Sequence, residues 1–177
     1  ENITPPAAPP TAPGAPVVVP TAPRAYSPLV DGFASYQGQS TCTPKAKPGA
    51  AKLASLLRTT YGSYSIGISR SCSVGGQSEH KEGRALDWMI SARVSSQKAQ
   101  ADAFIKWLTA TDKYGNTHAM VRRMGVMYII WNNKMWRAYD PGRGWTEYKN
   151  CSSTTSTGYD TTCHRDHVHI SFTWDGA

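Results

Sequence analysis

Two short segments, far apart in the chain, contain residue types that bind zinc. His80 and Asp87 are seven residues apart with Gly83 between them, which suits one ligand on a loop, a turn, and a second ligand on the returning strand. His167 and His169 are two residues apart, so on a regular strand their side chains face the same side. Two imidazoles and one carboxylate can fill three corners of a tetrahedral zinc site and leave the fourth open for water. The sequence therefore predicts one Zn²⁺ in a catalytic rather than a structural site.

The chemistry of such a site is hydrolysis. Zinc binds neutral imidazole nitrogen and carboxylate oxygen, polarises a carbonyl group and lowers the pKa of a bound water to about 7. Either half of the pattern alone is a weak signal. The two halves together in one domain favour the metal site.

The first segment also resembles a family signature. Ser78-x-His80-x-x-Gly83-x-Ala85-x-Asp87 is similar to the SxHxxGxAxD motif of the D-alanyl-D-alanine metallopeptidases, which include carboxypeptidases and L-alanyl-D-glutamate endopeptidases that trim peptidoglycan stems. This family shares its zinc core with lysostaphin-type endopeptidases and the hedgehog signalling domain. The resemblance covers residues from about 50 to 174 in the order of the motifs. It implies a zinc peptidase that hydrolyses peptide bonds in peptidoglycan.

The resemblance also implies roles for individual residues. By it, His80, Asp87 and His169 are the zinc ligands. In the family an arginine on a strand end precedes the first motif and holds a substrate carbonyl or carboxylate, and Arg70 stands at that position. We expect Ser78 to orient the loop that carries His80 and to contribute to the substrate side of the site.

The general base is open between two neighbours. The family usually has an acidic residue three positions before the last ligand, which favours Asp166. Strand parity turns Asp166 away from the cleft and His167 toward it, as in the HxH form of the lysostaphin branch. A base must lie within hydrogen-bond reach of the water that it deprotonates. We expect Asp166 to act as the base and His167 to orient or stabilise the oxyanion.

Helical periodicity predicts three helices. Residues 48–58 form an amphipathic pattern with Leu53, Leu56 and Leu57 on one face, Pro48 in the first turn and a stop at Gly62. A second helix is expected from a cap at Ser95 or Ser96 through about residue 110, and a short one over 118–124. The buried stripe of the second helix is expected to be Ala103, Phe104, Trp107 and Leu108.

Alternating patterns predict the strands. They are expected at residues 64–70, 84–90, 126–131, 135–139 and 167–174, with a loop over 140–163. Asn132-Asn133 is the expected hairpin turn, because asparagine tolerates positive φ. This order indicates an α+β fold, a small antiparallel sheet with flanking helices. The resemblance implies that the sheet holds a zinc core of the hedgehog and D-Ala-D-Ala peptidase type.

The first 28 residues differ in composition from the rest. Nine of the twelve prolines precede residue 29, interleaved with alanine and threonine. Such a tract cannot bury a core and favours extended polyproline II conformers. We expect a linker or stalk over 1–28 and one metallopeptidase-like domain over 29–177.

The four cysteines suggest an oxidising compartment. None forms a CxxC pair, so a zinc ribbon is disfavoured. An even number of cysteines beside a Pro/Thr-rich tract is typical of disulfides in a secreted or cell-wall-associated protein. Of the three possible pairings we favour Cys42–Cys72 and Cys151–Cys163.

The net charge is +7, with 19 basic against 12 acidic residues. The basic residues are scattered along the chain, so a nucleic-acid patch is not indicated, whereas an anionic wall polymer is compatible with the charge. No apolar run approaches the length of a membrane helix. The expected partner is peptidoglycan, with no nucleic acid and no membrane insertion, and the expected state is a monomer.

Several other side chains have plainer interpretations. Glu79 and Glu82 are expected to be solvated, although Glu82 could replace Asp87 as a ligand. His164 is expected at the rim of the site and His118 in ordinary packing. The tryptophans expected in the core are Trp88, Trp131 and Trp136, and the aromatic residues expected to line a substrate groove are Trp145 and Tyr148.

Two other functions compete with the peptidase. One is a catalytically silent zinc module that binds wall or a protein, as the hedgehog relatives illustrate. The other is a metal-dependent nuclease, which would need more carboxylates around a Mg²⁺ ion than this pattern offers.

Overall fold

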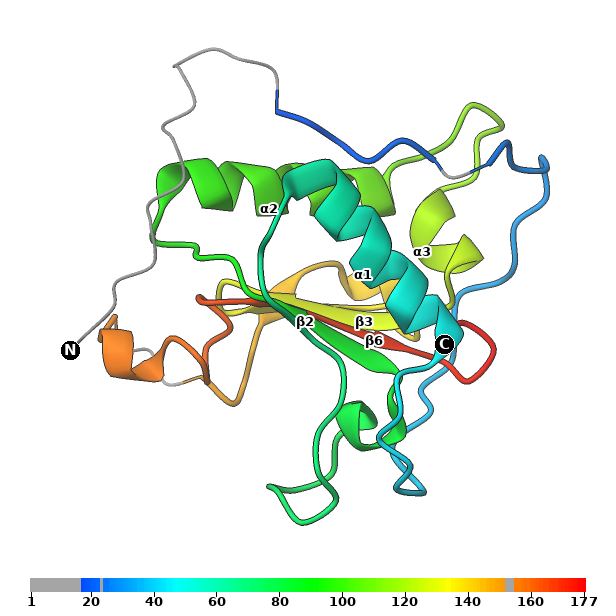
Figure 1. Ribbon diagram of the computed structural model, residues 1–177. Helices are drawn as coiled ribbons and strands as arrows, with labels where there is room; N and C mark the ends of the chain where they lie inside the picture. The colour runs from blue at the N-terminus through cyan, green and yellow to red at the C-terminus, as the bar shows by residue number, and fades with distance from the viewer. Residues whose placement is uncertain (1–16, 23, 152–154) are drawn as a thin grey trace.

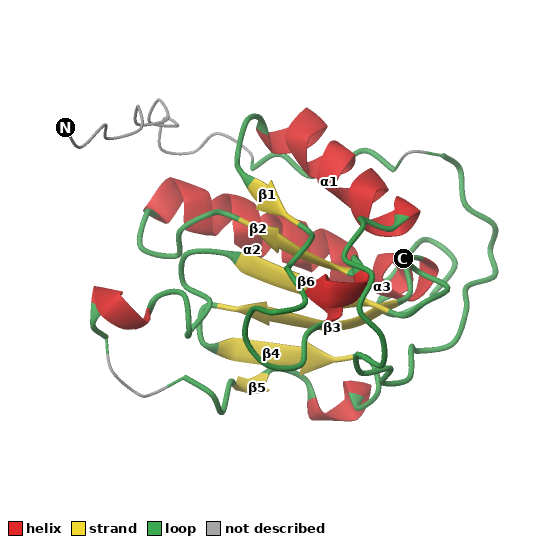
Figure 2. Ribbon diagram, turned by 60° about the horizontal axis from the view of Figure 1, so that its bottom comes forward, coloured by secondary structure: helices red, strands yellow, loops and turns green. Residues whose placement is uncertain are grey.

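A computed structural model describes residues 17–22, 24–151 and 155–177. Its centre is a six-stranded sheet in the order β1-β2-β6-β3-β4-β5, and every neighbouring pair is antiparallel (Figure 2). Helices pack on one face of the sheet and loops lie on the other (Figure 1). The α+β class and the small antiparallel sheet are therefore confirmed.

Helices and strands are interspersed along the chain. The helices are α1 (Pro48–Tyr61), α2 (Ser95–Thr109) and α3 (Ala119–Arg123), with short 3₁₀ turns at Glu79–Glu82, Pro141–Arg143 and Thr157–Tyr159. The strands are β1 (Ile66–Gly67), β2 (Ala85–Trp88), β3 (Val126–Trp131), β4 (Lys134–Arg137), β5 (Thr146–Glu147) and β6 (Val168–Phe172).

The two faces of the sheet have different compositions. On β2 and β6, Leu86 pairs with Ile170 on the face that packs against the helices. On the same strands, Asp87 pairs with His169 on the opposite face. Because side chains alternate along a strand, one strand supplies both the core and a polar site. The buried core tryptophans are Trp88, Trp131 and Trp136, as predicted.

Helix α1 follows its sequence signals closely. Pro48 lies in the first turn, where its missing N–H is not needed. Leu53 and Leu57 are buried, and Gly62, with φ of 89°, ends the helix by donating to the carbonyl of Arg58. The amphipathic pattern was sufficient to define this element.

Helix α2 differs from its prediction in two details. The residue at its N-cap is Val94, with no side-chain cap, so the predicted cap at Ser95 or Ser96 is wrong and Ser95 is the first helical residue. Phe104 and Leu108 are buried as expected, whereas Ala103 and Trp107 are only partly buried. The fully packed stripe is Ala101, Phe104, Ile105 and Leu108.

Strand β3 has the predicted bounds, whereas the other predicted strands are shorter than their patterns or shifted by a residue or two. The strand expected over 64–70 is reduced to Ile66–Gly67. The hairpin at Asn132-Asn133 is confirmed, with φ of 47° and 66° at the two residues. The segment expected as a loop over 140–163 contains the edge strand β5, which pairs with β4. Two-residue strands of this kind carry no period-2 signal.

The segment before α1 lies against the domain. The guanidinium of Arg123 lies 4.8 Å from the ring centroid of Tyr26 and donates to the carbonyl of Ser27 at 3.0 Å. The amide of Asn116 donates to the carbonyl of Pro28 at 2.8 Å. The boundary at 28/29 stays a prediction, and residues 1–16 and 23 of the expected linker lie outside the described residues. Among the described residues no helix has the length and apolar composition needed to cross a membrane.

Candidate metal centre

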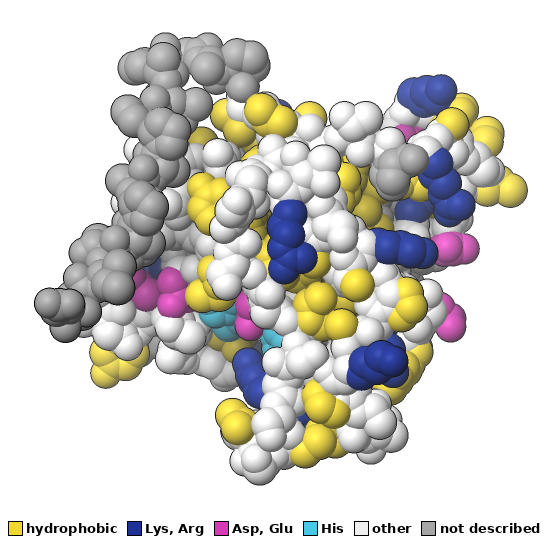
Figure 3. Space-filling view, viewed as in Figure 1, with side chains coloured by type: hydrophobic (Ala, Val, Ile, Leu, Met, Phe, Trp, Pro, Cys, Tyr) yellow, Lys and Arg dark blue, Asp and Glu magenta, His cyan; other side chains and the backbone are white. Residues whose placement is uncertain are grey.

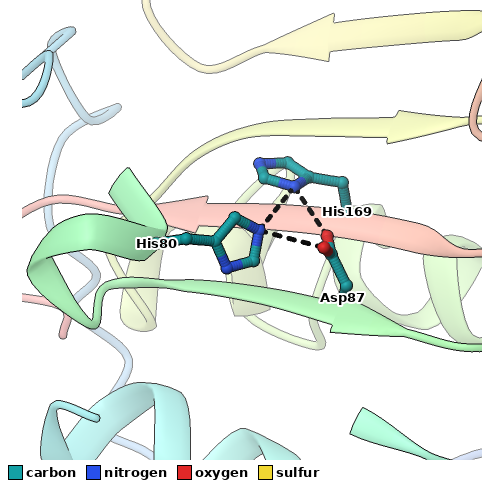
Figure 4. Close-up of side chains that lie close together, drawn as sticks. All are labelled: His80, Asp87 and His169. Carbon is teal, nitrogen blue, oxygen red and sulfur yellow. Dashed lines mark hydrogen bonds and ion pairs between the residues drawn. The ribbon is translucent and has the colours of Figure 1, made fainter. Parts of the chain in front are cut away.

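Three side chains from three segments converge at the centre of the sheet. His80 Nε2 lies 3.1 Å from Asp87 Oδ2 and 3.3 Å from His169 Nδ1, and His169 Nδ1 lies 2.8 Å from Asp87 Oδ1 (Figure 4). Asp87 and His169 are cross-strand partners on β2 and β6, whereas His80 comes from the 3₁₀ turn that precedes β2. The three residues that the sequence predicts as ligands are therefore brought together.

The turn that carries His80 is positioned by the motif residues around it. Ser78 accepts the backbone N–H of His80 and caps the turn. Gly83 ends the turn with φ of 67°, and a Cβ there would collide with the carbonyl of Lys45. Only glycine combines that left-handed conformation with so close a backbone contact.

Hydrogen bonds on the far side of both rings define which nitrogen faces the centre. His80 Nδ1 lies 2.8 Å from the carbonyl of Ile68, which can only accept, so Nδ1 carries the proton and Nε2 presents a lone pair. His169 Nε2 lies 2.8 Å from Ser171 Oγ, and Ser171 is 3.4 Å from the Glu79 carboxylate. Because Ser171 donates to Glu79, it accepts from His169 Nε2, and His169 Nδ1 presents its lone pair.

Three hydrogen-bond acceptors therefore face the centre of the group. Two imidazole lone pairs and an ionised carboxylate face one another, an arrangement that a cation between them stabilises. Burial would raise the pKa of the Asp87 carboxyl, but when no ion is bound the rings of His169 and His80 can carry a proton that faces it, and these interactions outweigh burial and hold the pKa well below its usual range. Burial lowers the pKa of His169. Neutral imidazole and ionised carboxylate are the forms that bind metals, so His80, Asp87 and His169 could hold a metal ion.

His167, rather than Asp166, faces this group. His167 Nε2 lies 3.6 Å from Asp87 Oδ1. Asp166 accepts from His167 Nδ1 at 2.7 Å and from Thr161 Oγ1 at 2.5 Å. The strand-parity expectation matches this placement, and Asp166 lies behind His167 as its hydrogen-bond partner.

Arg70 lies beside the His80 turn. Its backbone N–H donates to the carbonyl of His80 at 3.2 Å, and its guanidinium donates to Ser78 Oγ at 3.4 Å. The structure thus places Arg70 and Ser78 together at one side of the metal group. Their expected roles toward a substrate stay predictions.

Glu79 and Glu82 are buried, so the expectation that they are solvated is wrong. Glu79 accepts from the hydroxyl of Tyr128 at 2.5 Å, and the Tyr128 ring stacks on His169 with centroids 5.4 Å apart. Glu82 pairs with Arg84 at 2.6 Å, accepts from Ser40 and Thr41, and is not a member of the metal group. The charged run Glu-His-Lys-Glu is typical of a solvated turn, and the partners that bury it lie elsewhere in the sequence.

The two aromatic residues that were expected to line one substrate groove, Trp145 and Tyr148, lie at different sites. Tyr148 packs edge-on against His164, whose ring lies 4.5 Å from that of His167 and 5.7 Å from that of His169. His164 is therefore at the rim of the site, as expected. Trp145 instead lines a different cavity, between α2 and the β3–β4 hairpin. His118 stacks on Trp136 and serves packing.

Both favoured disulfides are present. Cys42 pairs with Cys72, which ties the segment before α1 to the loop that follows Arg70. Cys151 pairs with Cys163, directly before His164.

On the face seen in Figure 3, basic side chains are spread out, and histidine side chains are visible next to acidic ones. The spread of the basic side chains on this face agrees with their scatter along the sequence.

Comparison with known proteins identifies a family. No curated protein and no solved structure matches the chain significantly. A family described as "VldE, C-terminal domain" matches residues 42–159, about two thirds of the chain. This range contains His80 and Asp87 and ends before His167 and His169. The chain therefore belongs to the VldE C-terminal domain family.

Proposed function

We propose that this chain is a zinc-dependent peptidase that hydrolyses peptide bonds of bacterial peptidoglycan. The observation that carries the proposal is the convergence of His80 Nε2, Asp87 and His169 Nδ1 as three acceptors, with His167 on a further side. The resemblance of the segment from Ser78 to Asp87 to the D-Ala-D-Ala metallopeptidase motif supplies the substrate class.

Zinc is the proposed ion because two neutral imidazoles and one carboxylate match its preferred ligands. When bound, zinc would supply a Lewis acid that polarises a carbonyl group and lowers the pKa of water to about 7. Calcium and magnesium prefer oxygen ligands and fit this donor set poorly.

His167 is the proposed general base, in place of the Asp166 that we expected from the sequence. Because Asp166 accepts the Nδ1 proton, His167 Nε2 keeps a lone pair directed toward the metal group. It can take a proton from the attacking water and return it to the leaving amine. Asp166, held in turn by Thr161, would fix the ring orientation and stabilise the imidazolium.

Arg70 is the proposed contact for a substrate carbonyl or carboxylate. Its guanidinium is permanently charged and lies beside Ser78 at the edge of the site. The net charge of +7 would favour adsorption to an anionic wall, and two disulfides suit a secreted or wall-associated protein. We propose that the chain acts there as a monomer.

The test is digestion of purified peptidoglycan with and without a chelator, followed by mass spectrometry of the released fragments. We expect chelator-sensitive release, restored by zinc, and new amino termini that name the cleaved bond. If the zinc-loaded protein releases no fragment, the proposal that it is an enzyme acting on peptidoglycan is contradicted.

Two single substitutions assign the base. His167→Ala should abolish turnover while zinc stays bound, and Asp166→Asn should lower turnover less, since the ring can still accept a proton in some orientations. Thr161→Ala is the matched control, because it removes only the outer contact to Asp166. If Asp166→Asn is inactive while His167→Ala is active, the general base is Asp166 and not His167.

A second candidate is a catalytically silent zinc module that binds wall or a protein. The observation that favours it is the 3.6 Å separation of His167 Nε2 and Asp87 Oδ1, which would let His167 act as a fourth ligand and close the site. X-ray absorption spectroscopy of the zinc protein distinguishes the two. Three histidine ligands indicate the closed site, whereas two histidines and a water support the peptidase.

A further inference from the structure

We propose that a cavity beside Trp145 binds an acidic sugar of a polysaccharide, independently of the metal centre. The cavity, called here the Trp145 cavity, has a volume of about 440 Å³. This is within the size range of small-molecule sites in proteins. Its lining residues are Lys98, Asp102, Ile105, Lys106, Thr109, Trp131, Asn132, Lys134 and Trp145. None of them belongs to the metal group or to its hydrogen-bond partners.

Three regular elements build the cavity. Helix α2 contributes one stripe of side chains, the β3–β4 hairpin contributes the opposite wall, and Trp145 closes the space between them. Thr146 pairs with Met135 and Glu147 with Lys134, so the residue before them is presented by an ordered sheet edge. Trp145 is nevertheless 37% exposed. An indole that follows from an ordered sheet edge and is left partly in water is available to a ligand.

The charge of the cavity favours an anion. Three lysines line it against one carboxylate, Asp102. That carboxylate is occupied within the wall, because Asp102 accepts from Trp131 Nε1 at 3.0 Å and from Lys98 at 2.5 Å. Lys134 pairs with Glu147, whereas Lys106 has no acidic partner in the part of the chain that the structure describes. Lys106 is therefore the ammonium group best placed for an anionic ligand.

These features together fit a sugar ring that carries an acid. The C–H face of a pyranose is apolar, and covering the exposed indole of Trp145 with it removes apolar surface from water. A carboxylate on the ring would pair with Lys106, and the side-chain amide of Asn132 could bond to ring hydroxyls. A non-sugar polyanion would use the lysines without the indole, and a neutral sugar would use the indole without the lysines.

The test measures binding of three probes by isothermal titration calorimetry. They are a hyaluronan hexasaccharide (acidic sugar), chitohexaose (neutral sugar) and a short polyglutamate (acid without sugar). We expect the hyaluronan hexasaccharide to bind most tightly. Equal or tighter binding of polyglutamate, or no binding of the hyaluronan hexasaccharide, would overturn the proposal.

Matched variants localise the binding. Trp145→Ala should weaken hyaluronan binding by about tenfold, the effect of losing one buried indole face. Lys106→Ala should weaken it by about threefold, as for an exposed ion pair. The controls Tyr159→Ala and Lys113→Ala remove an exposed aromatic residue and an exposed lysine outside the cavity and should change nothing. Unchanged binding in both Trp145→Ala and Lys106→Ala would refute the site.

His80→Ala separates this inference from the proposed function. It removes a metal ligand, so peptidoglycan cleavage should be lost while hyaluronan binding remains. Loss of hyaluronan binding in folded His80→Ala would contradict an independent cavity.

Discussion

Two buried glutamates three residues apart in the Glu79–Glu82 turn perform different tasks. Glu79 is 4% exposed and lies under the metal group, where Tyr128 and Ser171 donate to it. Glu82 is fully buried and lies on the other side of the turn, where it pairs with Arg84. Glu79 therefore supports the metal group, whereas Glu82 stabilises the fold.

The Glu82 side holds the segment before α1 against the domain. Glu82 Oε1 accepts the backbone N–H groups of Ser40 and Thr41 at 2.9 and 2.8 Å. Arg84 donates to the carbonyls of Gln37 and Phe172 at 2.5 and 2.7 Å. The contacts of Glu82 and Arg84 therefore fix the turn that carries His80 on the side opposite to Glu79. Its metal-facing side is then free to be tuned separately.

The largest expected effect is on folding, from Glu82→Gln. This change leaves the charge of Arg84 buried without its partner and should lower the free energy of unfolding by about 3–5 kcal/mol. Urea unfolding measures it. In folded molecules the zinc affinity should be unchanged, and a parallel loss of zinc affinity would mean that the two ends of the turn are not separable.

The next effect is on metal binding, from Glu79→Gln. The neutral amide can donate to Ser171, which then donates to His169 Nε2 and moves the ring proton to the nitrogen that faces the metal. We expect the zinc affinity to fall by about 10–100-fold, as is usual for partners of metal-bound histidines. Competition with a chromophoric chelator measures it, with Glu82→Gln as control. An unchanged affinity would show that Glu79 does not control His169.

An effect of similar size, on stability instead of on metal binding, is expected from Tyr128→Phe. The ring that stacks on His169 is kept, and only the hydroxyl that donates to Glu79 is lost. The free energy of unfolding should fall by about 1–3 kcal/mol, because a buried carboxylate loses one donor. Thermal unfolding with Tyr139→Phe as control measures it, and equal effects in both variants would contradict a specific role.

The smallest effect is a change in pH dependence. Burial would raise the pKa of Glu82, but hydrogen bonds from Ser40, Thr41 and Arg84 outweigh it and lower that pKa below 4.5. The stability that the ionised group contributes is therefore present above pH 4.5 and is lost as the pH falls through the lowered pKa. Glu82→Gln should show a flatter decline of stability below pH 4.5. A decline identical to that of the unsubstituted protein would exclude this contribution.

Local sequence patterns were sufficient for much of the fold. The leucine stripe of α1 and the Asn132-Asn133 turn are short-range features, and both appear where they were expected. The metal group was predictable in part from the two local spacings of ligand residues, and the choice of His80, Asp87 and His169 among them came from the resemblance of the first segment to a known motif. The edge strand β5 was missed since two residues carry no periodicity.

The supporting side chains could not be read from the sequence. Glu79 meets Tyr128, 49 residues away, and Ser171, 92 residues away. Glu82 meets Ser40 at a separation of 42. Nothing near these glutamates in the sequence distinguishes them from solvated ones, because their environment exists only in the folded sheet. Trp145 was expected to line a substrate groove together with Tyr148, but the cavity that it lines depends on the packing of α2 against the hairpin.

The strand order has a consequence for biosynthesis. β6 is the last of the six strands in chain order, yet it lies between β2 and β3. Until it emerges from the ribosome, the growing chain has two half-sheets with open inner edges, which can pair with other chains. His169 arrives on this same strand, so the nascent chain cannot capture an ion with all three ligands early. Pairing of β6 with β2 and β3 therefore closes the sheet and completes the ligand set in the same late step of folding.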